Sequence, residues 1–189
     1  AFDPATGKLP TTLAGVGVFF NDAPAGLFFV RRDQLNVQVP FEVAGQERVT
    51  VRVEYQGIAS NVVEVAVRAV DPGAFAPVLN QDSSLNSAQN PALAGSTVQF
   101  FATGQGVVTP TLETGQPAPS TPPFATPRAS VRVLANGQPA TVFFAGLTPG
   151  LVGLMQVNVT LPAGLTGEVQ LELFIGEHPS PSKVTVFVR

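Results

Sequence analysis

Apolar and polar side chains alternate strictly in the stretch Val49-Thr50-Val51-Arg52-Val53-Glu54-Tyr55. A period of two places one side of an extended strand against a core and the other side in solvent. The same alternation recurs in residues 34–39, 169–175 and 183–188. These runs are short and are separated by Gly, Pro, Asn and Asp, which is typical of antiparallel strands joined by turns. We therefore predict an all-β chain built from sandwiches, without an amphipathic helix.

The sequence repeats one β unit twice. Residues 16–25 align with 131–140, and residues 35–40 align with 157–162. In the second copy the pair Asn136-Gly137 predicts a two-residue type I′ hairpin, because both positions tolerate a positive φ angle. The alignment predicts two tandem immunoglobulin-like sandwiches, with these bounds: 1–72 for the first, 73–189 for the second, and a Pro-rich insertion at 109–127 within the second.

The two copies differ at their starts. A good strand with Val98, Phe100 and Ala102 on one face precedes the second copy, whereas a lead rich in Gly and Pro precedes the first. The first sandwich is therefore expected to lack its opening strand. An incomplete sandwich exposes apolar surface and unpaired backbone groups, so another segment should cover it. Three sources stay open: the lead of residues 1–12, a preceding part of a longer parent protein, and a strand of another subunit.

Composition excludes several classes of function. The chain has 189 residues, of which 44% are hydrophobic and only 12% charged, and its net charge is −3. The ten basic residues are scattered, so a nucleic-acid surface is not expected. With no Cys and one His, zinc, iron–sulfur and thiol chemistry are not expected either, and we predict no cofactor. No apolar stretch approaches the roughly 18 residues that a membrane span needs.

Several motifs resemble an uncharacterised family of secreted bacterial modules, the Solibacter C-terminal domain family. They agree with it in order and spacing at residues 9–16, 34–42, 80–87, 102–106 and 147–159. The chain departs from the family pattern at Ser83, where Gly usually follows Asn-Gln-Asp. Each copy also resembles the immunoglobulin-like IPT/TIG repeat. The resemblance implies tandem β-sandwiches on the cell exterior, and it supplies no catalytic residues.

An enzymatic role is not expected. A hydrolase triad needs a base, and His178 is the single candidate. It aligns with the hairpin at Gly57 of the first copy, where a side chain is solvated and has no third group to orient it. The acidic residues fall mostly on outward strand positions or in turns, where they form a solvated face.

One run of oxygen-bearing residues is a weak calcium candidate. Asn80, Asp82, Ser84 and Asn86 place oxygens at every second position, as calcium loops do. The run lacks the central Gly, the second carboxylate and the distal Glu of such loops. A turn whose Asx side chains bond to its own backbone is the alternative, and we prefer it. No other metal site is predicted.

Exposed aromatic and edge residues are the candidates for a protein interface. Four Phe-Phe pairs would each place one ring inward and one outward in a strand. The expected open edge beside residues 16–20 adds apolar groups. The predicted interface residues are Val16, Val18, Phe20, Phe29 and Phe101. The sequon at Asn158 lies inside a predicted strand, which argues against glycosylation.

Together these patterns predict a non-enzymatic structural protein of the cell exterior. Its partners would be copies of itself, added head to tail into a surface fibre by strand complementation. The alternative is a C-terminal anchoring, sorting or ligand-binding module of a larger secreted chain, with carbohydrate or calcium as the ligand. Trp is absent and Tyr occurs once, so carbohydrate binding has little support from composition.

Overall fold

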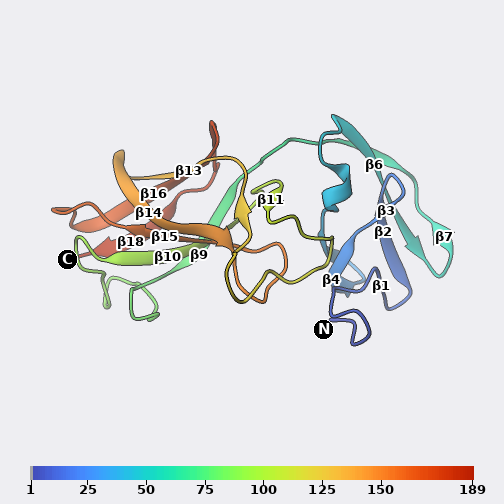
Figure 1. Cartoon of the computed structure of the whole chain (residues 1–189), viewed down its shortest axis with the longest axis horizontal. Helices are drawn as coiled ribbons and strands as arrows, with labels where there is room; N and C mark the ends of the chain where they lie inside the picture. The colour runs from blue at the N-terminus through green and yellow to red at the C-terminus, as the bar shows by residue number, and fades with distance from the viewer. Residues whose placement is uncertain (1) are drawn as a thin grey trace. The chain divides into compact units, whose positions relative to one another are not determined.

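The computed structural model describes residues 2–189 and consists of strands and turns (Figure 1). Within those residues the only helical segment is a single 3-10 turn, Phe41–Val43. The chain divides into two compact units, and both are discontinuous in sequence. Unit 1 contains the chain as far as Ala69 together with Thr109–Ala125 and Pro149–Gly153; unit 2 contains Val70–Val108, Thr126–Thr148 and Leu154–Arg189. The prediction of an all-β, immunoglobulin-like fold is confirmed.

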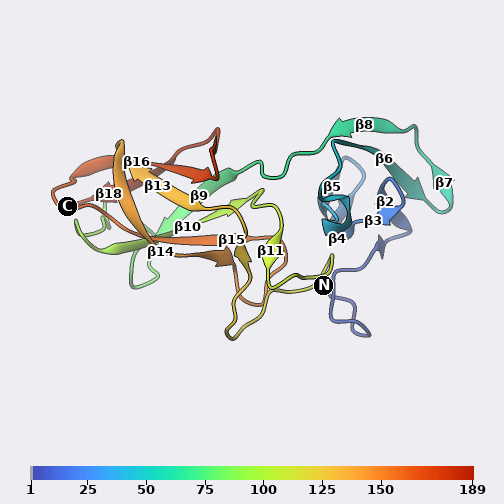
Figure 2. The ribbon, with the colours of Figure 1, turned by 45° about the horizontal axis from the view of Figure 1, so that its top comes forward.

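Unit 1 is built from two sheets. In the first, the order is β1-β2-β6-β7, with β3 beside β2 and β8 beside β6, while β4 and β5 form a separate pair (Figure 2). The strands are β1 (Thr12–Leu13), β2 (Val16–Phe20), β3 (Ala23–Pro24), β4 (Gly26–Arg31), β5 (Gln34–Gln38), β6 (Arg48–Tyr55), β7 (Ile58–Ala59) and β8 (Val63–Ala66).

Unit 2 has one larger sheet. Its order is β17-β16-β13-β14-β15-β10-β9, with β18 beside β16. Its strands, with the short β11 and β12 pair, are β9 (Gly73–Leu79), β10 (Thr97–Thr103), β11 (Val108–Thr109), β12 (Thr126–Pro127), β13 (Val131–Ala135), β14 (Gln138–Leu147), β15 (Met155–Thr160), β16 (Gly167–Ile175), β17 (His178–Pro179) and β18 (Val184–Val188).

The predicted repeat has the same strand pairing in both units. Phe20 pairs with Ala23 across the first hairpin, and Ala135 pairs with Gln138 at the aligned place. The hairpin at Asn136-Gly137 has positive φ at both residues, as its type I′ signal predicts. β2 pairs with β6 as β13 pairs with β16, and β6 pairs with β8 as β16 pairs with β18. The alignment of the two copies is therefore an alignment of strands.

One bulge recurs as well. The β4–β5 register shifts between Leu27 and Phe29, and the β14–β15 register shifts between Val142 and Phe144. A bulge inserts an unpaired residue and breaks the alternation of faces. Phe28 and Phe29 are therefore both exposed, contrary to the expected arrangement of one ring inward and one outward.

Each unit has its own core. In unit 2 the core takes side chains from both halves of the bent sheet, including the fully buried Phe100, Val157 and Leu171. The core of unit 1 is smaller and centres on Val18, Leu27 and Val49. Several apolar side chains that pack against this smaller core are only partly buried. The candidate site is the surface where these side chains remain accessible to solvent.

The Pro-rich segment belongs to unit 1, although the alignment assigns it to the second sandwich. The Leu9 N–H donates to the Gly115 carbonyl (2.9 Å), and the Gly115 N–H donates to Oε1 of the buried Gln38 (2.6 Å). Thr114 accepts a hydrogen bond from the Phe41 N–H. The sequence pattern does not predict these hydrogen bonds, because the Pro-rich segment is not a continuous strand and so has no alternation of apolar and polar residues.

Candidate functional site

Unit 2 shows how a complete unit surrounds the strand β15. One edge of β15 pairs with β14 and the other with β10, whose Val98 lies opposite Val159 and whose Phe100 lies opposite Val157. Val98, Phe100 and Ala102 are buried, each 1% exposed or less. β9 then pairs with the far edge of β10. Two strands from the start of unit 2 therefore extend its sheet beyond β15.

The segment that carries these strands also covers the edge of β18. The Ala74 N–H at the start of β9 donates to Oγ of Ser180 (2.9 Å), just before β18. Beyond β9, the Asn86 side chain accepts from the Phe187 N–H (2.7 Å) and donates to the Phe187 carbonyl (2.9 Å). Ala92 forms a parallel bridge with Val188. Residues 73–103 thus contact the free edges of both β15 and β18.

Unit 1 has no counterpart of residues 73–103. Within residues 2–189, β5 pairs only with β4, and β8 pairs only with β6. β5 corresponds to β15 and β8 corresponds to β18, so both borders of the equivalent space are open edges. The unit lacks two strands and their connector, where the sequence predicted the loss of one strand.

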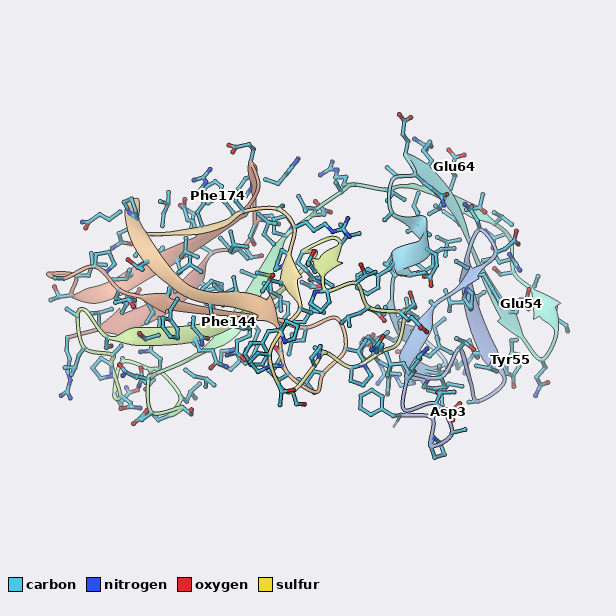
Figure 3. All side chains as sticks on the ribbon, in the orientation of Figure 1. Asp3, Glu54, Tyr55, Glu64, Phe144 and Phe174 are labelled. Atoms are coloured by element: carbon cyan, nitrogen blue, oxygen red, sulfur yellow. The ribbon has the colours of Figure 1, made fainter. Side chains whose placement is uncertain are left out.

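Apolar side chains along this space are less buried in unit 1 than in unit 2: Tyr55 and Val63 are exposed, and the others are partly buried. Tyr55 is 53% exposed and its counterpart Ile175 is 0% exposed. Val63 is 52% exposed, whereas its counterpart Val184 is 3% exposed. Figure 3 labels Tyr55 in unit 1, near the end of β6. We call this surface the open face and define it by six residues: Leu35, Val37, Val51, Val53, Tyr55 and Val63.

The open edge at β5 lacks the charge and the proline that often protect edge strands. Its residues Gln34–Gln38 include no charge, no Pro and no Gly. The edge strand β9 of unit 2, in contrast, contains Pro77, which removes a backbone donor. Natural sheets usually block exposed edges in this way, so an unprotected edge beside exposed apolar residues is typical of a docking site for a strand.

The predicted interface residues lie elsewhere. Val16, Val18 and Phe20 are buried in β2, which has strand neighbours on both sides, so the open edge is at β5 and not beside β2. Phe29 is 41% exposed on β4, and Phe101 is half-buried on β10 opposite Gln156. The reason is topological. β6 lies far along the chain from β2 and pairs with the edge of β2 that the sequence analysis expects to be open.

The lead segment does not close the open face. The Leu27 N–H donates to the Pro10 carbonyl (2.8 Å), and Thr12 and Leu13 pair with the start of β2. β12 takes the aligned position in unit 2, beside β14. The lead therefore takes the same position in unit 1 that β12 takes in unit 2. Among the described residues it forms no strand pairing with β5.

The calcium candidates form a hydrogen-bonded turn. Asp82 Oδ1 accepts from the Ser84 N–H (3.0 Å) and from the Ser84 hydroxyl (2.6 Å), and these bonds hold the pKa of the Asp82 carboxyl below its usual value. The Asn86 amide donates to Oδ1 of Asn80 (2.9 Å). Within residues 2–189 no group of three or more His, Cys, Asp or Glu could hold a metal ion. The side-chain oxygens of Asn80 and Asp82 accept from donors of the same turn, and that of Asn86 accepts from the Phe187 N–H of β18.

The ionisable candidates lie on the surface. His178 is exposed in the hairpin strand β17, opposite Ile175. Glu64 pairs with Arg48 and Glu172 with Lys183 across neighbouring strands. Asn158 lies inside β15, between Gln99 and Phe144. This arrangement stabilises strand surfaces and does not converge on a reacting atom.

Sequence reasoning missed the open face, although its strands were recognised. Alternation predicts a core position for Leu35, Val37, Val51 and Val53, but it carries no information on whether a facing layer exists. The available signal is the block that precedes the second copy, because the strand that it contains, with Val98, Phe100 and Ala102 on one face, has no counterpart before the first copy. Among the described residues no helix is long and apolar enough to cross a membrane.

Comparison with known proteins adds little. The chain matches no family model, and it matches no curated protein. A solved structure that it does match is the S-layer protein SbsC, domains 4 and 5, with 16% sequence identity and a TM-score of 0.26. The match covers 100% of this chain and 78% of that chain. At this TM-score the similarity carries no argument about fold or function.

Proposed function

We propose that the protein is a non-enzymatic structural protein of the cell exterior, joined to its assembly through unit 1. In this assembly a neighbouring polypeptide supplies β strands that pair with β5 and cover the open face. The single observation that carries the proposal is the contrast between two units of identical register, one completed by residues 73–103 and one open. The resemblance to secreted modules supports the location.

The physical reason is the cost of leaving the open face in water. Burying apolar surface stabilises by about 25 cal/mol per Å², and each large side chain of the open face adds to that sum. Backbone groups on the open edge gain partners at the same time. Unit 1 is therefore expected to bind a strand of suitable pattern, and the contacts are side-chain packing and main-chain pairing rather than chemistry.

A fibre is the open-ended form of such an assembly. A subunit that accepts strands at unit 1 and contributes a different surface to its neighbour makes a heterologous contact, which grows head to tail when it does not close. Electron microscopy of cell-surface material is expected to show filaments that contain this chain. Closed particles of fixed size would contradict the fibre and leave complementation itself intact.

Tyr55 allows a direct test, because it is the only Tyr in the chain. Tyrosine nitration is measured on intact producing cells and on the purified monomer. We expect Tyr55 to react several-fold more slowly on cells, since the neighbouring strands cover it. The matched control is Phe143→Tyr, whose site in unit 2 is 80% exposed, and which should react equally in both samples. Equal reactivity of Tyr55 in both samples would refute the proposal.

A further inference from the structure

We infer that the natural occupant of unit 1 is a two-stranded segment of the type of residues 73–103 that is not itself part of residues 1–189. The inference rests on the proposed function and specifies its partner. Three observations lead to it: the register of β10 on β15, the path of β9 along β18, and the Asn86 contact with the β18 edge. Each has an unoccupied equivalent in unit 1.

The first strand position is set by β5. In unit 2 the β10 residues Val98 and Phe100 lie opposite Val159 and Val157. The aligned residues of β5 are Val37 and Leu35, which are only partly buried. The occupant therefore runs antiparallel to β5, with a medium-sized apolar residue opposite Val37 and an aromatic one opposite Leu35. Small polar residues fit the alternate positions, where Gln99 lies in unit 2.

A single strand does not complete the unit. The far side of the open face, at Tyr55 and Val63, corresponds to Ile175, which pairs with β17, and to Val184, the first residue of β18; neither pairs with β15. In unit 2 a second strand, β9, contacts β18 and contributes the buried Ala74 and Val78 to the same core. A second strand is needed to bury these side chains in unit 1.

The connector between the two strands has a site as well. Phe187 presents its N–H and carbonyl to the Asn86 side chain, and Ala66 is the aligned residue of β8. Ala66 is exposed and pairs on its other side with Arg48. An amide side chain in the connector would form the same two hydrogen bonds with the Ala66 backbone. Strand, connector and strand thus form one recognition unit.

Copies of this chain do not supply the segment by exchange. Each chain carries residues 73–103 once and contains two units that need them. Moving the segment from unit 2 of one copy to unit 1 of another would complete one unit and open another, exposing Phe100 and Val98. Exchange therefore gains no buried core, and the donor must carry an additional segment of this type.

The test uses a synthetic peptide of residues 73–103 as the probe, titrated into the full chain. Tyr55 fluorescence reports the open face, because the chain contains no Trp. We expect one peptide per chain, a saturable change in Tyr55 emission, and hydrogen exchange at least about tenfold slower in both Gln34–Gln38 and Val63–Ala66. A shorter peptide of residues 97–103 should protect only Gln34–Gln38.

Matched variants check the site. Val37→Lys places a charge on the open face and should abolish binding. Phe28→Lys on β4 should bind normally, because its counterpart Phe143 stays 80% exposed in the complete unit 2. A peptide carrying Phe100→Lys should not bind. Where the free peptide is poorly soluble, the segment is linked to the start of the chain by a Gly/Ser linker, and protection of the same two strands is measured.

The outcomes separate this inference from the proposed function. Equal protection by the short and the long peptide refutes the two-stranded occupant. Absence of binding, with Tyr55 nevertheless protected on cells, refutes the inference and leaves the proposed function standing. Binding of the long peptide at both edges, with Tyr55 reactive on cells, supports the inference and refutes the proposed function.

Discussion

Two asparagines hold the hairpins that set the repeat. Asn21 and Asn136 both have positive φ, and each accepts a backbone hydrogen bond on its side chain: from Thr50 at 2.8 Å and from Gln170 at 2.8 Å. Asn tolerates the left-handed region better than most residues and can bond locally. One side chain thus shapes the turn between two strands and ties it to a third.

Substitutions at Asn136 separate these two roles. Asn136→Gly removes the side-chain hydrogen bond and keeps the backbone angle, so a loss of about 0.5–1.5 kcal/mol in unfolding free energy is expected. Asn136→Ala adds the strain of a positive φ and should cost about 1 kcal/mol more. Chemical denaturation measures both. If the two variants lose the same stability, backbone strain contributes nothing at this turn.

Gly104 tests steric exclusion at a second residue. Gly104 and Gly95 have nearly the same φ, +76° and +78°, but a Cβ on Gly104 would lie 1.8 Å from the Asp71 carbonyl oxygen, while one on Gly95 would meet nothing within 4 Å. Gly95→Ala should therefore cost about 1 kcal/mol from the backbone angle. Gly104→Ala should cost several times that value, or prevent unit 2 from folding. Similar losses for both, measured by thermal unfolding, would contradict the steric account.

At the scale of elements, Asn86 replaces a strand at the edge of β18. Its side chain forms both hydrogen bonds with the Phe187 backbone and is 9% exposed. Asn86→Ala leaves the Phe187 N–H without this acceptor, so we expect a loss of about 1–3 kcal/mol. Asn90→Ala, an exposed amide of the same turn, should cost less than about 1 kcal/mol. Equal losses in denaturant titrations would show that burial of the Asn86 amide is irrelevant.

The Pro-rich segment is tied to unit 1 by an ion pair that responds to pH. The hydrogen bond and the charge of Lys8 lower the pKa of Glu113 from its usual 4.5. A carboxyl group whose pKa is lower in the folded than in the unfolded chain stabilises the folded state at pH values above its unfolded pKa. This contribution disappears as the pH falls through its folded pKa. Glu113→Gln should lower the unfolding midpoint of unit 1 slightly at pH 6, and the difference should shrink progressively as the pH falls below 4.5. Because the pair is exposed, the difference should also vanish in 1 M salt.

The control for this prediction is Glu47→Gln, which removes one exposed carboxylate from the same unit. It changes the net charge equally, so it should leave the pH dependence of the midpoint as in the unsubstituted chain. A pH response that changes equally in both variants would assign the effect to net charge and not to the contact of Glu113 with Lys8.

The elements of this fold could be predicted from sequence because each carries a local signal. Alternation located β6, β16 and β18, and the aligned copies located the hairpins. Neighbours of a strand are not local, so the sequence placed the open edge beside β2, where β6 lies. The contacts of Gly115 with Leu9 and Gln38 were equally invisible, since one isolated hydrogen bond leaves no periodic trace.

At the scale of the whole molecule, the two units are unequal versions of one structure. Val51, Val53 and Val65 are partly buried in unit 1, and their counterparts Leu171, Leu173 and Val186 are 0% exposed in unit 2. Apolar burial supplies most of the free energy of folding. Unit 1 by itself should therefore be less stable than unit 2, and completion of the open face should reduce the difference.

Thermal unfolding of the isolated chain should accordingly show two transitions, the first in unit 1. Tyr55 fluorescence follows unit 1 alone, while far-UV circular dichroism follows both. Val49→Ala and Val169→Ala are matched, since the two residues are aligned and buried at 2% and 0% exposure. Each should cost about 2 kcal/mol. Val49→Ala should shift only the first transition and Val169→Ala only the second. A single transition that both variants shift alike would mean that the units unfold together, and the stability of unit 1 would then not depend on its own incomplete core.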